Sequence, residues 1–171
     1  MRIAVLIANG TEEIEVITPI DALRRGGAKV DVLSVNEDML TCSHGVVIKA
    51  DDLVSNADRD AYDGVVIPGG MPGATNVSQN EDAVNLIKSV KKRGKMVAAI
   101  CASPAVVLAA HGLIEGLKAT CYPAPEFIAA LGESYTGKDV EVDNNVITAN
   151  GPKAALEFSK AICEYLKLKW F

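Results

Sequence analysis

Short apolar runs alternate with segments of helical periodicity along this chain, and this alternation limits the possible folds more than any other feature. Strands are predicted for the apolar runs at residues 2–8, 29–35, 64–67, 95–100 and 118–121. Helices are predicted for residues 18–25, 81–93, 102–110 and 152–166, the first because Thr18-Pro19 resembles a capped helix start. Strands that alternate with helices form a mostly parallel sheet with helices on both faces, so the sequence predicts an α/β fold.

The length and composition are those of one folded domain that spans residues 1–171. A chain of this size buries roughly 70% of the surface that its unfolded form exposes. Its 49% hydrophobic and 23% charged residues are ordinary for a folded protein. Two hairpins are also predicted, one over residues 42–49 and the segment before them, outside the main sheet, and one over residues 140–149 around Asn144-Asn145.

Charge and cysteine usage argue against several classes of function. The formal net charge of -5 gives no electrostatic reason to bind nucleic acid or an anionic membrane. No segment approaches the ~20 apolar residues that cross a bilayer, and the first residues are typical of a strand rather than an export signal. The four cysteines show no CxxC pair and no metal-ligand spacing, so we expect reduced thiols, no metal and a cytoplasmic location.

Cys101 is the strongest candidate for a reactive group. It follows the buried strand at residues 95–100 directly and precedes a helix, with small residues after it. This arrangement is typical of a nucleophile elbow, although the glycines of the serine version are absent. The turn would expose the side chain, and the helix N-terminus would favour the thiolate. The alternative is a buried core cysteine, which is the more common fate of this residue.

Other polar groups are expected at the same edge of the sheet, because ligands bind at the carboxyl ends of parallel strands. The glycine-rich residues 68–74 could turn backbone N–H groups toward an oxyanion, or could form a simple turn. Glu15 could complement a helix dipole, or could point into the crevice and move protons beside a thiol. Neither His44 nor His111 is near Cys101 in the sequence, so a cysteine–histidine hydrolase is not indicated.

Four short motifs together match a known family. They are residues 10–15 (GTEEIE), 68–70 (PGG), 99–102 (AICA) and 150–152 (NGP). On these motifs the chain resembles the ThiJ/PfpI family, and within it the Parkinsonism-associated deglycase branch, over nearly its whole length. The resemblance implies a flavodoxin-like three-layer sandwich and a homodimer that needs no cofactor.

The resemblance also implies roles for individual residues. Cys101 would be the reactive cysteine and Glu15 its carboxylic acid partner, while Gly70 and Ala102 would supply backbone N–H groups near the reacting oxygen. Gly69, Tyr122 and His44 are the further supporting candidates at or near these motifs.

The sequence departs from the family pattern in three places. The peptidase-like branch carries histidine where this chain has Ala102, which argues against peptidase activity. Many animal members carry histidine where this chain has Tyr122, so a catalytic base is not expected there. The chain ends at Trp170-Phe171 without the extra C-terminal helix of the animal members, which predicts a more open site.

Three functions are compatible with these residues. The first is a cofactor-independent glyoxalase and protein deglycase that acts on a small reactive dicarbonyl, such as methylglyoxal, or on a glycated adduct. The second is a non-enzymatic oxidative-stress sensor or redox-regulated chaperone that uses the same thiol, because an exposed low-pKa cysteine oxidises readily. The third is an amide or ester hydrolase, which would need a histidine base.

Overall fold

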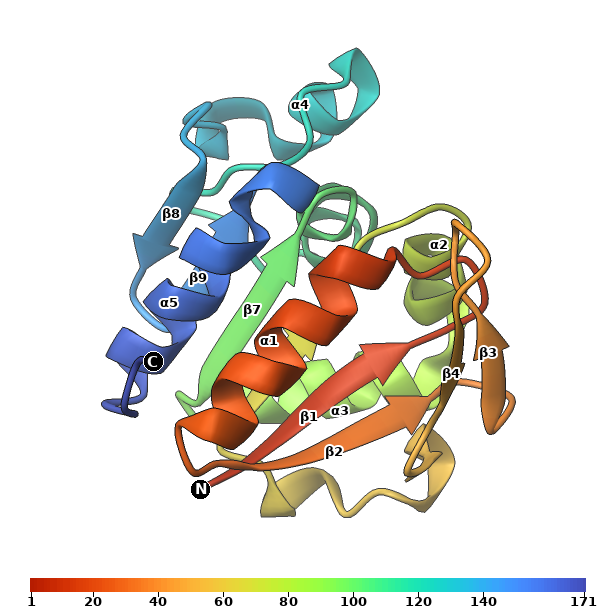
Figure 1. Ribbon diagram of the computed structural model, residues 1–171. Coiled ribbons are helices and arrows are strands. Elements are labelled where there is room, and N and C mark those ends of the chain that lie inside the picture. Colours follow the sequence, from red (N-terminus) through yellow and green to blue (C-terminus); the bar gives the residue numbers. More distant parts are fainter.

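A seven-stranded sheet forms the centre of the computed structural model, which describes residues 1–171 (Figure 1). Its strand order is β5-β2-β1-β6-β7-β9-β8, and only β8 runs antiparallel to its neighbour. The strands are β1 (Arg2–Ile7), β2 (Lys29–Ser34), β5 (Asp52–Leu53), β6 (Gly64–Ile67), β7 (Met96–Ile100), β8 (Val140–Asp143) and β9 (Val146–Ala149). The predicted mostly parallel α/β sheet is therefore confirmed.

Helices cover both faces of this sheet. They are α1 (Glu13–Arg25), α2 (Gly73–Gln79), α3 (Glu81–Lys92), α4 (Pro125–Leu131) and α5 (Ala155–Tyr165). Helices α1 and α5 lie side by side in front of the sheet in Figure 1, and α3 lies behind it. Each face carries its own cluster of 24 buried hydrophobic residues, so the sheet is equally covered on both sides. This is the expected three-layer, flavodoxin-like sandwich.

Shorter elements connect these layers. A two-stranded antiparallel hairpin, β3 (Met39–Thr41) with β4 (Val47–Lys49), lies outside the main sheet, as predicted. A π-helical turn, Pro104–Leu108, follows Cys101. Short 3-10 turns cover Val54–Asn56, Arg59–Ala61, Ala109–His111, Gly132–Ser134 and Pro152–Ala154. No helix in the fold is both long and apolar enough to traverse a lipid bilayer.

The start of α1 differs from the prediction. The helix begins at Glu13 rather than Thr18, and Pro19 lies inside it. The cap is Glu12, whose carboxylate accepts a hydrogen bond from the backbone N–H of Glu15 at 2.8 Å. This cap and the buried face of the helix outweigh the one hydrogen bond that proline removes. As a result, Glu15 lies in the first helical turn and not in a loop.

The predicted strand at residues 118–121 is also wrong. Only an isolated parallel bridge forms there, between Ala119 and Tyr135. The reason lies in Thr120, whose backbone N–H donates to the side chain of Thr148 at 2.9 Å instead of to a strand backbone. The sequence analysis also missed α2, α4 and the short strand β5.

Candidate active site

Cys101 follows β7 directly and has a strained backbone. Its φ is 64°, in the left-handed region that residues with a side chain seldom adopt. Two backbone hydrogen bonds hold this conformation: the Cys101 N–H donates to Ala149 at 2.9 Å, and its carbonyl accepts from Tyr122 at 2.8 Å. The thiol is partly exposed, whereas Cys42, Cys121 and Cys163 are buried. The chain therefore forms the tight turn that the nucleophile-elbow interpretation requires.

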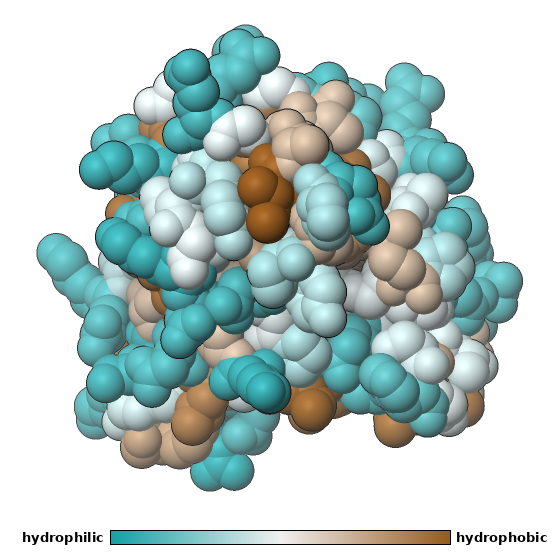
Figure 2. Space-filling view, turned by 90° about the horizontal axis from the view of Figure 1, so that it is seen from above, coloured by the Kyte–Doolittle hydropathy of each residue, from teal (hydrophilic) through white to brown (hydrophobic).

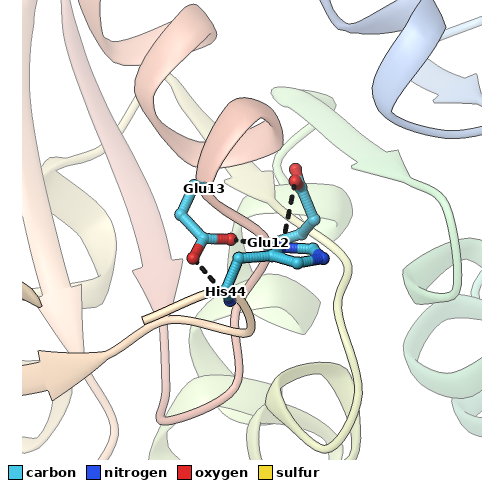
Figure 3. A group of neighbouring side chains, drawn as sticks. All are labelled: Glu12, Glu13 and His44. Atoms are coloured by element: carbon cyan, nitrogen blue, oxygen red, sulfur yellow. Dashed lines mark hydrogen bonds and ion pairs between the residues drawn. The ribbon is translucent and has the colours of Figure 1, made fainter. Parts of the chain in front are cut away.

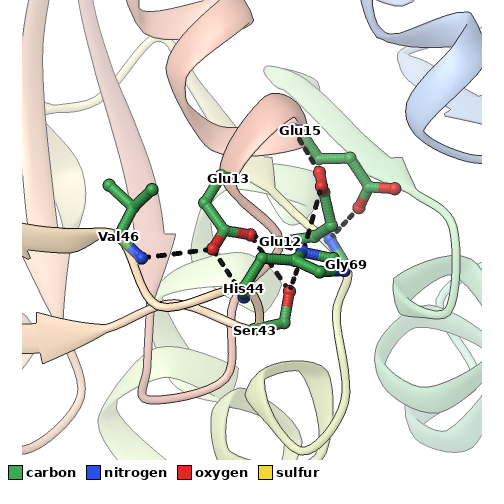
Figure 4. A network of polar contacts seen from close by, with 7 residues as sticks. All are labelled: Glu12, Glu13, Glu15, Ser43, His44, Val46 and Gly69. Atoms are coloured by element: carbon green, nitrogen blue, oxygen red, sulfur yellow. Dashed lines mark hydrogen bonds and ion pairs between the residues drawn. The ribbon is translucent and has the colours of Figure 1, made fainter.

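Glu15 reaches the same place from α1, and its side chain is fully buried. Its Oε2 accepts a hydrogen bond from the backbone N–H of Gly69 at 2.8 Å, while Oε1 has no hydrogen-bond partner (Figure 4). A Cβ atom placed on Gly69 would lie 2.6 Å from both the Cys101 Cβ and the Glu15 Oε2. Glycine at this position therefore lets the thiol and the carboxyl approach each other closely.

Burial controls the ionisation of both groups. It raises the pKa of Glu15 to about 7, and the charge of Glu12 adds to this effect, although the Gly69 hydrogen bond opposes it. Burial, followed by the charge and hydrogen bonding of Glu15, raises the pKa of Cys101 to about 12. The expectation that the turn simply favours the thiolate is therefore wrong, because burial and a neighbouring carboxylate outweigh the helix N-terminus.

The two contributions of Glu15 to the Cys101 pKa exist only while the carboxyl is ionised. When Glu15 is protonated, its negative charge is gone and its O–H can donate to sulfur, which favours the thiolate. The two residues therefore titrate as one coupled pair. Protonation of the Glu15 carboxyl favours ionisation of the Cys101 sulfur.

Backbone N–H groups face the thiol from two sides. Those of Gly70 and Ala102 form hydrogen bonds with Cys101 that lower its pKa. Gly70 has a φ of 85°, and a Cβ atom there would collide with the backbone of Glu12 and Gly10. A side chain at this position would therefore force apart the loop and the start of α1.

Of the supporting candidates outside the glycine-rich loop, only Tyr122 lies beside Cys101. Its backbone bonds to Cys101, and its ring covers Gly151, where a Cβ atom would lie 3.3 Å from it. His44 instead contacts Glu13, with 2.9 Å between Nδ1 and Oε2 (Figure 4). This hydrogen bond raises the pKa of His44. His111 contacts Ser78 at 3.1 Å, so neither histidine is paired with the thiol.

Glu12, Glu13 and His44 form a compact cluster at the start of α1 (Figure 3). Their possible ligand atoms all lie within 4.8 Å of one another, so these are the residues that could hold a metal ion. Burial tends to raise the pKa of Glu13, but hydrogen bonds from His44, its own backbone and Val46 lower it to about 2. The cluster brings together two glutamates and a histidine that are far apart in the chain. A search for closely spaced cysteine ligands could not have found it.

Sequence analysis also missed two features around the thiol. Ser103 donates to the carbonyl of Pro68 at 2.6 Å and so ties the elbow to the glycine-rich loop. A pocket of about 460 Å³ lies beside Tyr122 and includes Lys153, which no motif had indicated.

From above, the molecule exposes hydrophobic residues singly between hydrophilic ones, without one broad apolar patch (Figure 2).

Comparison with known proteins agrees with this geometry. The profile of the DJ-1/PfpI family matches residues 1–165, and the chain therefore belongs to that family. Protein DJ-1 homolog B of Arabidopsis thaliana is 37% identical over 167 residues, which are 96% of this chain and 38% of that protein. The chain thus spans about two fifths of this plant relative. The Parkinson disease protein 7 homolog of Danio rerio is 36% identical over 169 residues, covering 96% of this chain and 89% of the relative.

Solved structures show the same architecture. The oxidised DJ-1 of Toxoplasma gondii has a TM-score of 0.92 and 42% identity, and the match covers 96% of this chain and 90% of that one. DJ-1beta of Drosophila melanogaster has a TM-score of 0.90 and 38% identity, with coverage of 96% and 89%. Both similarities extend over nearly the whole fold.

Proposed function

We propose that this protein is a cofactor-independent glyoxalase and protein deglycase that acts on methylglyoxal or its adducts. One observation carries the proposal: the partly exposed Cys101 thiol lies beside the buried Glu15 carboxyl, whose Oε1 has no hydrogen-bond partner. A pKa of about 7 allows this carboxyl to accept and release a proton near neutral pH. Membership of the DJ-1/PfpI family supports the assignment.

The reaction needs no oxidant. The Cys101 sulfur bonds to the aldehyde carbon of methylglyoxal, and the carbonyl oxygen takes a proton to give a hemithioacetal. The N–H groups of Gly70 and Ala102 stabilise the oxygen while it carries negative charge. Glu15 removes the proton from the former aldehyde carbon and delivers it to the adjacent carbon, while the hydroxyl proton of the hemithioacetal moves to the ketone oxygen, which leaves a lactoyl thioester. Water then cleaves the carbon–sulfur bond and releases lactate and the free thiol.

The test is lactate formation from methylglyoxal by purified protein and by two alanine variants. Cys101→Ala should lose essentially all turnover because no nucleophile remains. Cys163→Ala is the matched control, since it removes a buried thiol from α5 and should keep turnover. Turnover by Cys101→Ala at the wild-type rate, or no turnover by the wild type, would refute the proposal.

A second function uses the same pair as an oxidation sensor or redox-regulated chaperone. It is favoured by the raised pKa of Glu15, because a protonated carboxyl can donate a hydrogen bond to a Cys101 sulfinate. The oxidised state of the Toxoplasma gondii relative gives this alternative a precedent. Peptide mass spectrometry after mild peroxide should find sulfinate at Cys101 in the wild type and less of it in Glu15→Gln.

An amide or ester hydrolase is the weakest of the three functions. It would need a histidine base near the thiol, but His44 contacts Glu13 and His111 contacts Ser78. We therefore do not extend the proposal to that reaction.

We also propose that the protein acts as a homodimer and works in the cytoplasm. Two apolar side chains of α1, Ile14 and Ile17, are 53% and 46% exposed, and Val46 and Val47 of the adjoining hairpin are 49% and 56% exposed. The hairpin adjoins α1 because Glu13 bonds to the backbone of His44 and Val46, so these exposed side chains lie on neighbouring segments. Unpaired cysteines suit a reducing compartment.

A further inference from the structure

The pocket beside Cys101 has a lining that the glyoxalase chemistry does not use. Its volume of about 460 Å³ falls within the range of small-molecule sites and exceeds what a small dicarbonyl fills. It is lined by Tyr122, Pro123, Asn150, Gly151, Pro152 and Lys153. Lys153 is the only charged side chain among them, and no carboxylate lines the pocket.

Two walls of this pocket are attached to Cys101 by its backbone. The Cys101 carbonyl accepts from Tyr122 on one wall at 2.8 Å, and its N–H donates to Ala149 at 2.9 Å, directly before Asn150 on the other. The Tyr122 ring lies against Gly151 and joins the two walls. The pocket therefore adjoins the residue that carries the thiol, and Cys101 itself does not line it.

The charge of Lys153 is not neutralised within the protein. Lys153 forms no ion pair. The nearby Asp139 carboxylate is engaged by the side-chain amide of Asn150 at 2.7 Å, and Glu157 is exposed in the first turn of α5. The pocket therefore offers an ammonium group outside any ion pair, together with a hydrogen-bond donor on Tyr122, whereas the Asn150 amide already donates to Asp139.

We propose that this pocket binds an anionic group of the substrate, so that the protein selects carbonyl compounds that carry a carboxylate or phosphate. The proposal rests on the function proposed above, because it assumes that the reacting carbonyl is at Cys101. It assigns Lys153 as the specificity-determining residue. Cys101 and Glu15 carry out the reaction, and Lys153 discriminates between charged and neutral substrates.

A pair of alkylating reagents tests this without any turnover. Iodoacetate and iodoacetamide both transfer a carbon to the thiol and differ in having a carboxylate or a neutral amide. The rate at Cys101 is followed by peptide mapping for each reagent, in the wild type and in Lys153→Met. Lys88→Met is the matched control, because it removes an equal charge from an exposed position on α3 that does not line the pocket.

We expect the ratio of the iodoacetate rate to the iodoacetamide rate to fall roughly 1.5- to fivefold in Lys153→Met, the range of one exposed charge interaction. Lys88→Met should leave the ratio unchanged, Lys153→Arg should keep it high, and added salt should lower it in the wild type. An unchanged ratio in Lys153→Met, an equal fall in Lys88→Met, or no reaction of Cys101 with either reagent would overturn the proposal. If turnover of methylglyoxal failed while the ratio behaved as expected, only the glyoxalase assignment would be lost.

Discussion

Replacing Gly69 with alanine tests how closely the thiol and the carboxyl must approach. The new Cβ would lie 2.6 Å from the Cys101 Cβ, 2.6 Å from the Glu15 Oε2 and 2.9 Å from the carbonyl oxygen of Ile100. The Ile100 oxygen belongs to the backbone of central strand β7, and Cys101 follows it directly, so Glu15 has the most freedom to move. Its carboxyl must retreat by roughly 0.5–1 Å to reach ordinary contact, which also weakens its 2.8 Å bond to Gly69.

Two magnitudes follow from this displacement. Overpacking of this kind costs about 1–3 kcal/mol of unfolding free energy, and each kcal/mol lowers the melting temperature by roughly 2–4 °C in a chain of this size. A misplacement of about 1 Å in a catalytic group costs on the order of 100-fold in turnover. Gly69→Ala should therefore lose far more activity than its stability loss explains.

The assay combines urea denaturation with methylglyoxal turnover, both below the melting temperature of every variant. Gly94→Ala is the control: Gly94 has a φ of 69°, and a Cβ atom placed there would meet no atom within 4 Å, so only backbone strain of about 1 kcal/mol is added. That variant should lose stability and keep turnover. If Gly69→Ala kept wild-type turnover, close approach of Cys101 and Glu15 would not be what the site requires.

Three further predictions concern charge, assembly and reactivity. Because burial raises the Glu15 pKa from 4.5 to about 7, the native state holds this proton more tightly than the unfolded state. The contribution of this group to the free energy of unfolding is complete below pH 4.5 and declines by on the order of 3 kcal/mol as pH rises to about 7. Urea denaturation of Glu15→Gln at several pH values should lack this decline. A pH profile of stability identical to that of the wild type would contradict the prediction. Ile17→Glu should convert the proposed homodimer into a monomer in sedimentation experiments, since a charge would replace an exposed apolar side chain of α1; a persisting dimer would place the interface elsewhere. With limiting iodoacetamide, Cys101 should label before Cys42, Cys121 and Cys163, because those three thiols are buried; earlier labelling of any of them would show that exposure does not control reactivity here.

The central sheet could be predicted because its strands are continuous apolar runs between turn residues. The prediction for residues 64–67 coincides with β6, and that for residues 95–100 contains β7. The start of α1 could not be read in the same way. Thr18-Pro19 has the local pattern of a helix start, but a carboxylate six residues earlier provides the actual cap. The strand predicted for residues 118–121 does not form. A side chain of β9 accepts the backbone hydrogen bond that a neighbouring strand would otherwise have accepted.

The site was predictable where the chain itself determines the geometry. A buried strand that runs into small residues indicated the turn at Cys101, and a glycine pair indicated the loop that faces it. The role of Gly69 as a gap between two side chains, and the contact between His44 and Glu13, depend on segments 30 or more residues apart. Spacing along the sequence carries no information about such contacts, so only the folded chain reveals them.

The difference in burial between Glu15 and Cys101 explains how a thiol with a raised pKa can still react. A negative charge on Glu15 lies in a fully buried group whose hydrogen-bond donors are the N–H of Gly69 and the thiol of Cys101. The same charge on Cys101 lies in a partly exposed group with two donors, the N–H groups of Gly70 and Ala102. Burial of Glu15 and the two donors on sulfur narrow the gap between the pKa values of about 7 and about 12. Moving the proton from sulfur to the carboxyl therefore costs less than it would beside an exposed carboxylate, and it leaves the net charge of the pair unchanged. Reactivity then depends on keeping Glu15 buried, which is why a change that lets water reach Glu15 should slow Cys101 even though it leaves the thiol untouched.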